Sequence, residues 1–233
     1  MSFFRTALVA ATVLVASAAA QAATVSYGTT PASTSTLTTG LMTTNFTTSL
    51  TLPKFNTSLG TLTSVAIDFA GSVNSTIKFE SLDAAASTIT GTASATVTLT
   101  RPDNTQLAVA LPSNTRSAQE TAYDGVTDFA GSSGDVFSNI SGSLTAATVT
   151  LTSASDLALF SGAGNILLPV TGAGSSSVSG AGNVVSQINT QASGSAYVVY
   201  TYSATPVGVP EPASMALLGA GLAGLGLMRR SKA

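Results

Sequence analysis

The chain of 233 residues has no cysteine, histidine or tryptophan, and only 8% of its residues are charged. The absence of cysteine excludes disulfides, thiolate nucleophiles and cysteine-bound metals. The absence of histidine excludes Ser-His-Asp and Cys-His catalytic systems and zinc sites built on imidazole. Any folded part must therefore be stabilised by its own hydrophobic core, without covalent or metal cross-links.

The few charges are mostly negative, and hydroxyl groups provide much of the polarity. Residues 23–209 carry four basic and nine acidic side chains, a net charge of −5. This balance argues against nucleic acid or an anionic membrane surface as a partner. The chain contains 33 Ser and 36 Thr, a bias found in extracellular β proteins and in disordered stalks. Because apolar residues recur at regular positions, we expect a folded domain.

Apolar and polar residues alternate with a period of two along much of the chain, which indicates β-strands. Val65, Ile67 and Phe69 share one face of such a segment, and residues 92–100 and 196–202 alternate in the same way. Ala70-Gly71-Ser72 is predicted to be a hairpin turn. No long segment keeps a helical period, so we predict an all-β domain, an antiparallel sandwich or barrel, flanked by an N-terminal signal helix and a C-terminal hydrophobic sorting helix.

The first 22 residues have the three parts of a secretory signal peptide. Arg5 supplies the positive charge, residues 7–15 form a short apolar run, and Ala20-Gln21-Ala22 fits the small-x-small cleavage rule. We therefore predict cleavage between Ala22 and Ala23, with the Sec translocon and signal peptidase as partners. The alternative is a membrane anchor, which the short apolar run disfavours.

The C-terminus carries a second three-part signal. Val209-Pro210-Glu211-Pro212 precedes an apolar run, and the basic residues Arg229, Arg230 and Lys232 follow it. The 17 residues from Pro212 to Met228 are at the lower limit for spanning a bilayer core of about 30 Å. The basic end should stay in the cytoplasm. This orientation would place Pro-Glu-Pro at the outward surface of the membrane that the apolar run spans. Each proline holds its neighbour extended, and an extended peptide suits a protease.

This segment resembles the PEP-CTERM sorting signal of Gram-negative bacteria that make exopolysaccharide. The resemblance implies transient anchoring in the inner membrane and recognition by exosortase, a membrane-embedded cysteine protease that cleaves near Pro-Glu-Pro. An ordinary C-terminal anchor is the alternative. A sortase-like pattern, residues 168–172, lies about 40 residues before the apolar run. We interpret it instead as a strand that ends in a glycine turn.

The region between the two signals resembles the choice-of-anchor E domain, a bacterial surface domain joined to different anchors in different proteins. The resemblance rests on Leu52–Leu62, Tyr123–Gly134, Ser179–Asn183 and Tyr200–Tyr202, which together extend over most of residues 24–205. It implies an exported β domain. It identifies no catalytic residue.

Asp124, Asp128 and Asp135 lie in a segment rich in glycine and serine, and three interpretations are open. Two carboxylates facing each other across a sugar could hydrolyse a glycosidic bond. Carboxylates and loop carbonyls could instead bind Ca²⁺, although no EF-hand spacing is present. Loop aspartates also form Asx-turns, which we favour.

Two other features could contact polysaccharide. A ladder of hydroxyl residues occupies one face of residues 92–100: Thr92, Ser94, Thr96, Thr98 and Thr100. Such a ladder could hydrogen-bond sugars, but it also suits a solvated strand face. Tyr197, Tyr200 and Tyr202 could stack on sugars. Because Tyr200 and Tyr202 share one face, packing in the core or at an edge is the favoured interpretation for them.

We therefore predict a signal peptide (1–22), a choice-of-anchor E-like β domain (23–205) and a PEP-CTERM sorting signal (206–233). The predicted protein has no catalytic role and needs no cofactor, with Ca²⁺ as an option. It passes through the inner membrane to the cell surface or extracellular matrix of a Gram-negative bacterium. There it has a structural or adhesive role in exopolysaccharide, biofilm or floc. The alternatives are a carbohydrate- or calcium-binding module and, less favoured, a glycosidase.

Overall fold

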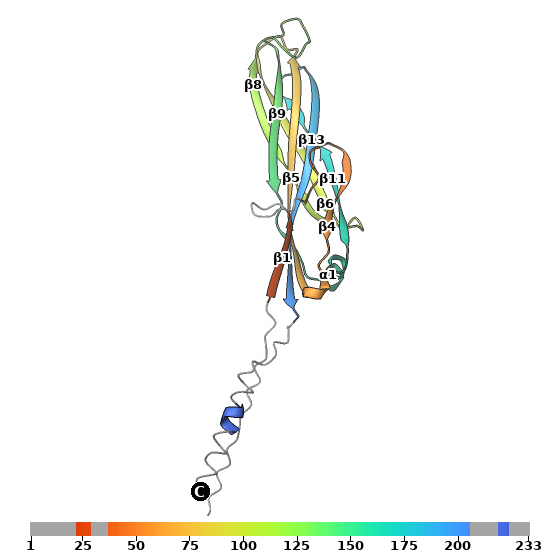
Figure 1. Cartoon of the computed structure of the whole chain (residues 1–233). Coiled ribbons are helices and arrows are strands. Elements are labelled where there is room, and N and C mark those ends of the chain that lie inside the picture. The colour runs from red at the N-terminus through yellow and green to blue at the C-terminus, as the bar shows by residue number, and fades with distance from the viewer. Residues whose placement is uncertain (1–21, 29–36, 206–218, 224–233) are drawn as a thin grey trace, which may run out of the picture. The chain divides into compact units, whose positions relative to one another are not determined.

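The computed structural model describes residues 22–28, 37–205 and 219–223. Ala22–Ser203 form one compact unit. The second unit holds the remaining residues, of which only 204–205 and a short helix at 219–223 are described. The compact unit consists of two antiparallel sheets packed face to face (Figure 1). The prediction of an all-β antiparallel sandwich is thus confirmed. The predicted signal helix and most of the sorting helix lie outside the described residues.

The first sheet contains seven strands. Its main path runs through β1 (Ala22–Gly28), β13 (Val184–Ala204), β5 (Gly60–Ser81) and β10 (Val149–Leu151). The short strands β2 (Leu37–Thr38) and β3 (Met42–Thr43) pair with β13, and β9 (Gly134–Thr145) pairs with β5. β5 therefore lies between partners on both sides, and its outward residues form the middle of the sheet's outer face.

The second sheet contains six strands. Its main path runs through β12 (Ser177–Ser179), β6 (Ser87–Thr100), β11 (Asn165–Gly174) and β4 (Phe46–Pro53). β7 (Gln106–Ala110) and β8 (Ser113–Glu120) pair with successive parts of β6. The residues of the sortase-like pattern belong to β11, which continues to Gly174 instead of ending in a turn at Gly172.

The core follows directly from the alternation in the sequence. From Val65 to Phe79 in β5 and throughout β6, odd-numbered residues point inward and even-numbered residues point outward. Each large apolar side chain removed from water contributes about 1.5–3 kcal/mol. The inward set is fully or almost fully buried and includes Val65, Ile67, Phe69, Val73, Ile77, Phe79, Ile89, Val97 and Leu99.

The predicted hairpin turn at Ala70-Gly71-Ser72 is wrong, because β5 runs through it without a break from Gly60 to Ser81. Gly71 is required for packing instead. A Cβ on Gly71 would lie 2.9 Å from the Cβ of Ala110 and 3.2 Å from that of Val97. The glycine therefore permits a close approach of the two sheets, a role that looks the same as a turn signal in the sequence.

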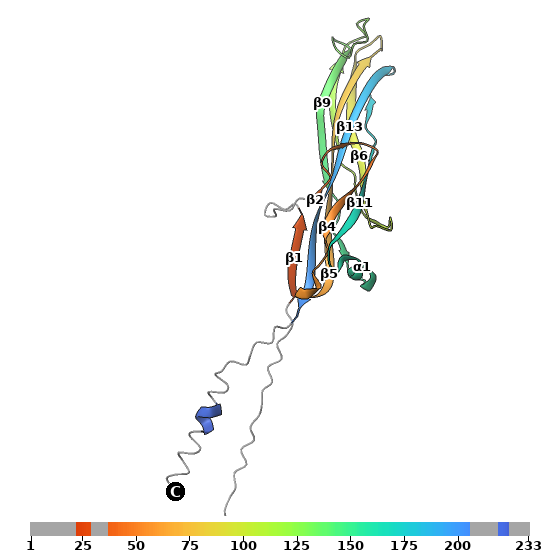
Figure 2. The same cartoon turned by 45° about the vertical axis from the view of Figure 1, so that its right-hand side comes forward.

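One end of the core is closed by aromatic rings and a helix. Phe55, Phe160 and Tyr200 are almost completely buried, and the Tyr200 hydroxyl donates to the Pro53 carbonyl at 2.9 Å. Phe160 ends α1 (Ala154–Phe160), whose N-cap is Ser153, and a 3₁₀ turn, η1 (Thr57–Leu59), precedes β5. Figure 2 shows α1 beside this end of β5.

The two ends of the compact unit lie side by side. β1 pairs antiparallel with the last part of β13, so that Ala22 lies opposite Ser203 and Ala23 opposite Tyr202. The strand that begins the folded unit therefore borders the strand that ends it.

Candidate functional site

Of the predicted signal-peptide residues, Ala22 and Ala23 are the first residues of β1, and Ala20 lies outside the described part of the chain. The sorting residues Val209, Pro210, Glu211, Pro212, Arg229 and Arg230 also lie outside it. Within the described ranges, no helix has the length and apolarity that a membrane span needs. The predicted transmembrane helix is therefore not supported by the described residues.

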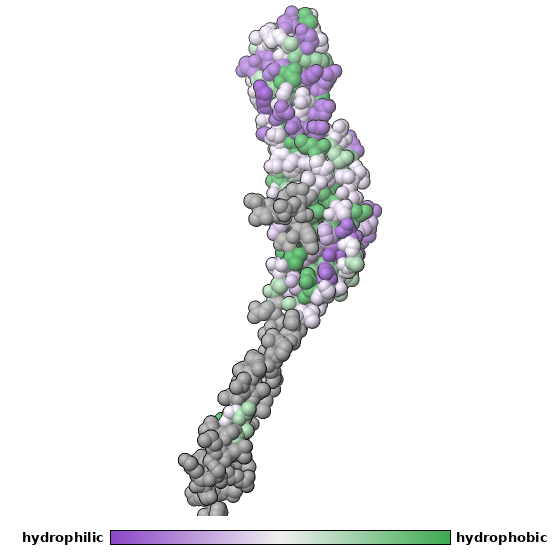
Figure 3. Space-filling model, viewed as in Figure 1, coloured by the Kyte–Doolittle hydropathy of each residue, from purple (hydrophilic) through white to green (hydrophobic). Residues whose placement is uncertain are grey.

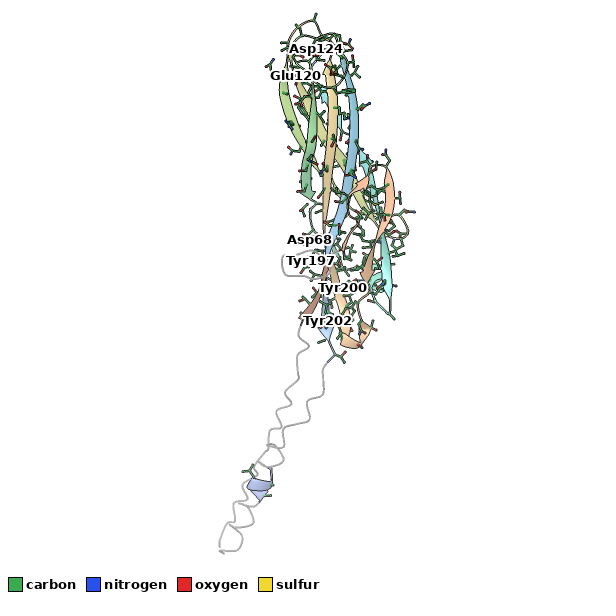
Figure 4. All side chains as sticks on the ribbon, turned by 45° about the horizontal axis from the view of Figure 1, so that its top comes forward. Asp68, Glu120, Asp124, Tyr197, Tyr200 and Tyr202 are labelled. Atoms are coloured by element: carbon green, nitrogen blue, oxygen red, sulfur yellow. The ribbon has the colours of Figure 1, made fainter. Side chains whose placement is uncertain are left out.

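Figure 4 shows Asp124 and Glu120 at the end of the sandwich opposite Tyr202. Asp124 accepts the N–H of Val126 at 3.0 Å and that of Ser132 at 3.4 Å. Asp128 accepts the N–H of Ala130 at 3.0 Å. The contacts with Val126 and Ala130, each two residues after its aspartate, are those of Asx-turns. The N–H of Val126 is the main cause that lowers the pKa of Asp124.

Asp135 is the second residue of β9 and pairs with Phe79, and its carboxylate accepts the N–H of Val136 at 2.6 Å. It therefore lies on a strand, apart from the turns that hold Asp124 and Asp128. Across residues 22–28, 37–205 and 219–223, no three acidic side chains come together as a group that could hold a metal ion. The geometry of these aspartates is thus that of turn and strand-end contacts.

Sequence reasoning missed Glu80, whose carboxylate binds the loop between β8 and β9. Glu80 is completely buried, although its even number places it on the outward face of β5. Its carboxylate accepts the N–H of Phe129 at 2.7 Å and the hydroxyl of Ser133 at 2.5 Å. The loop between β8 and β9 therefore covers Glu80. An isolated glutamate at the end of an alternating strand carries no signal of this role.

Glu120 is the second buried acid of this end, with 7% of its surface exposed. It ends β8 opposite Ser87, on the inward side of the second sheet. Burial raises the pKa of the Glu120 carboxyl, and the negative charges of Asp135 and Glu80 raise it further. This end of the core therefore favours a protonated Glu120 more than water does.

Replacing Glu120 with glutamine is expected to stabilise the domain at neutral pH. In the unfolded chain the group ionises near its ordinary pKa of 4.5, but in the folded domain it holds its proton to higher pH. The folded state thus binds more protons above that value, and wild-type stability falls as the pH rises through the raised pKa. Urea unfolding at pH 4 and pH 8 measures this, and the gap between variant and wild type should appear only at pH 8.

Asp103 offers a control of opposite sign. The N–H of Thr105 is the main cause that lowers its pKa below the ordinary 3.8. Its contribution to stability is therefore present above that value and lost as the pH falls through the lowered pKa. Asp103→Asn should thus lower stability at pH 8 and make no difference in strong acid. Equal effects of both variants at both pH values would contradict the assignment.

The predicted hydroxyl ladder lies on the outer face of β6, where all five residues are half-buried. Part of it is used inside the protein. The Ser94 hydroxyl bonds that of Ser175 at 2.8 Å, and the Thr100 hydroxyl donates to the Pro169 carbonyl at 3.5 Å. These contacts join neighbouring segments of the sheet and leave fewer hydroxyls for a ligand.

The three tyrosines of β13 point to different faces of the strand, as alternation predicts. Tyr200 is buried in the core, and the ring of Tyr202 lies 5.0 Å from that of Phe55. Packing of these two side chains is thus confirmed. Tyr197 points to the other face of β13, where it lines a small cavity of about 110 Å³ with Asp68 (Figure 4).

Two larger cavities lie on the outer face of the first sheet. The first, of about 590 Å³, is lined by Thr76, Lys78, Gln187, Ile188, Asn189 and Gln191. The second, of about 490 Å³, is lined by Leu41, Ser72, Val73, Asn74, Ser141, Gly142, Ser143 and Ser193. Successive outward residues of β5 connect them, so we treat both as one feature, the amide groove. Figure 3 shows hydrophilic residues gathered over the part of the domain farthest from β1.

Residues 208–230 match the model of the PEP-CTERM protein-sorting motif. This match marks the chain as an exported protein of Gram-negative bacteria that exosortase processes. No curated protein matches the chain.

Among solved structures, a chain from the infectious bursal disease virus Gx strain is 13% identical, with a TM-score of 0.20. The alignment covers 87% of this chain and 47% of that one. A VP2 subviral particle of the same virus is 9% identical over 79% of this chain and 34% of its own, with a TM-score of 0.18. This chain thus spans less than half the length of these viral chains. With TM-scores this low, the likeness does not indicate a shared fold or function.

Proposed function

We propose that the chain is a non-catalytic protein of the cell surface or extracellular matrix, with a structural or adhesive role in exopolysaccharide, biofilm or floc. The sorting motif carries this proposal. It begins at residue 208, shortly after β13 ends at Ala204. Cleavage near Pro-Glu-Pro would therefore remove the apolar segment and leave both sheets complete.

Residues 23–205 are, in this proposal, a choice-of-anchor E domain. The resemblance of their motifs to that family supports it, and so does their all-β fold. The non-catalytic assignment is supported by the loop acids. Asp124 and Asp128 accept backbone N–H groups within their own turns. Such contacts stabilise a loop and leave these carboxylates poorly placed to act on a substrate.

Replacing Pro210 and Pro212 together with alanine is expected to leave unprocessed protein in the inner membrane. Proline disfavours a helix and restricts the residue before it to extended conformations, whereas alanine favours a helix, so the replacement should make this peptide a poorer protease substrate. Intact mass and cell fractionation check this in the native host. The wild type should lose the C-terminal segment and leave the inner membrane, whereas the variant should do neither.

Pro206→Ala provides the matched control, since Pro206 lies just before the sorting motif. We expect this control to be processed normally. A strain without exosortase should reproduce the phenotype of the double variant with the wild-type chain. Normal mass and secretion of the double variant would refute the assigned role of Pro-Glu-Pro.

A further inference from the structure

The amide groove runs along the outer face of the first sheet, over β5 and its neighbours. Ser72, Asn74, Thr76 and Lys78 are successive outward residues of β5. At about 3.3 Å per residue, they span about 20 Å along the strand. β13 forms one side of the groove and β9 part of the other. The length and openness of this surface suit a linear chain better than a single small molecule.

The lining is chemically unusual for this protein. Four carboxamides meet there, from Asn74, Gln187, Asn189 and Gln191. Asparagine is depleted in strands, so its presence on a strand face runs against local propensity. A carboxamide has both donors and an acceptor and is uncharged, which matches the mixed donor and acceptor character of sugar hydroxyls.

These amides are free to bind a ligand. Within the described part of the chain, the side chains of Asn74, Thr76, Asn189 and Gln191 make no hydrogen bond to the protein. The hydroxyls on the outer face of β6 differ, because several of them bond neighbouring segments. The groove therefore offers a row of unused donors and acceptors on a rigid sheet.

The charge of the groove distinguishes between anionic and uncharged polymers as its ligand. Among the described residues that line the groove, Lys78 is the single charged one, and none of them is a carboxylate. The domain around it carries a net charge of −5 over residues 23–209. A polyanion such as a uronate polysaccharide or DNA would be repelled by the domain and attracted by one lysine only. An uncharged chain incurs no such repulsion.

We propose that the amide groove binds a neutral polysaccharide chain along β5. This inference deepens the proposed role in the extracellular matrix and rests on the export of the protein. The amides and hydroxyls hydrogen-bond the sugar hydroxyls along the strand. Tyr197, farther along the same face of the sheet, extends the surface with an aromatic ring.

Affinity electrophoresis of the processed protein tests the proposal. The gels would contain the neutral fraction of the producing strain's own extracellular polysaccharide, or xylan, galactomannan or a β-glucan. Alginate and double-stranded DNA serve as anionic probes. We expect retardation by at least one neutral polysaccharide and none by the anionic probes. Replacing Asn74, Asn189 and Gln191 together with alanine should weaken binding at least about tenfold, because three hydrogen-bonding side chains are lost.

The matched control replaces three exposed residues of the other sheet, Thr47, Thr51 and Asn165, with alanine. It should bind as the wild type does, and circular dichroism should show both variants folded. Retardation by no neutral polysaccharide, stronger retardation by alginate or DNA, or full binding by the groove variant would each overturn the inference. Because mass and fractionation test export separately, a failure of either claim is recognisable without the other.

Discussion

Replacing Arg101 with alanine is expected to lower the free energy of unfolding by about 3 kcal/mol, which urea unfolding would measure. Arg101 follows β6, and its guanidinium forms an ion pair with Asp156 in α1. The Asp156 side chain is only 9% exposed, so removal of its partner leaves a buried carboxylate without compensation. Breaking a buried pair costs about 3–5 kcal/mol, and the 22% exposure of Arg101 places this one at the lower end.

The double variant Arg101→Leu with Asp156→Leu separates the cost of a broken pair from the value of an intact one. It removes both charges and replaces them with apolar side chains, of which the leucine at 156 is larger than the aspartate. We expect it to be more stable than Arg101→Ala and within about 1 kcal/mol of the wild type, since buried pairs are often matched by apolar replacements. A loss below about 0.5 kcal/mol in Arg101→Ala would show that the pair contributes nothing.

The position of the ion pair explains why its loss should also disturb α1 and the core behind it. α1 ends at Phe160, which is completely buried among the aromatic rings that close the core. The helix has only seven residues and is too short to be stable alone. Its N-cap Ser153 and the contact of Asp156 with Arg101 therefore fix it in place. When α1 detaches, the ring of Phe160 leaves the core as well.

Much of the sandwich could be predicted from alternation alone, because a strand with one buried face must show a period of two. The inward residues follow that rule from Val65 to Phe79 in β5 and along the whole of β6. The length of β5 could not be predicted, since Gly71 is typical of a turn when its neighbours are unknown. Only the approach of Ala110 and Val97 from the other sheet explains this glycine.

A repeated pentapeptide shows the limit of local sequence most directly. Asp-Phe-Ala-Gly-Ser occurs at 68–72 and at 128–132. In the first copy, Phe69 is fully buried within β5. In the second, Phe129 has a left-handed backbone with φ of 59° in the loop before β9. Pairing with β9 holds the first copy, and hydrogen bonds to acidic side chains hold the second.

The functional surfaces could be predicted only in part, for the same reason. The sorting signal is contiguous, so its residues are recognised without any fold. The amide groove combines β5 with β13, more than 100 residues apart, and only the sheet topology brings Asn74 near Gln191. The loop acids were visible in the sequence, but Glu80 beneath them was not. Its role depends on a loop about 50 residues later.

Glu80→Ala is expected to cost about 3 kcal/mol and to release the loop between β8 and β9. Glu80 is completely buried and accepts hydrogen bonds from the backbone of Phe129 and the hydroxyl of Ser133. Hydrogen bonds to a charged acceptor contribute about 1.5–3 kcal/mol each, and their loss leaves donors without partners. Phe129 also stores strain, since a left-handed backbone costs an ordinary residue about 1–2 kcal/mol. Without Glu80, the Phe129 N–H loses the hydrogen bond that helps to offset this strain.

Hydrogen exchange at the Phe129 amide and protease cleavage within residues 121–133 measure the release, and urea unfolding measures the global cost. Glu80→Gln should be much milder, because its carbonyl oxygen still accepts the Phe129 N–H and the Ser133 hydroxyl can rotate to accept from the new amide. Asp128→Ala is the matched control in the same loop, since Asp128 is exposed and accepts one N–H only. The proposed role of Glu80 in fixing the loop requires that, of the three variants, only Glu80→Ala exposes the loop. Equal protection of Phe129 in all three variants would mean that the loop's own turns hold it, and that Glu80 is buried there without a structural role.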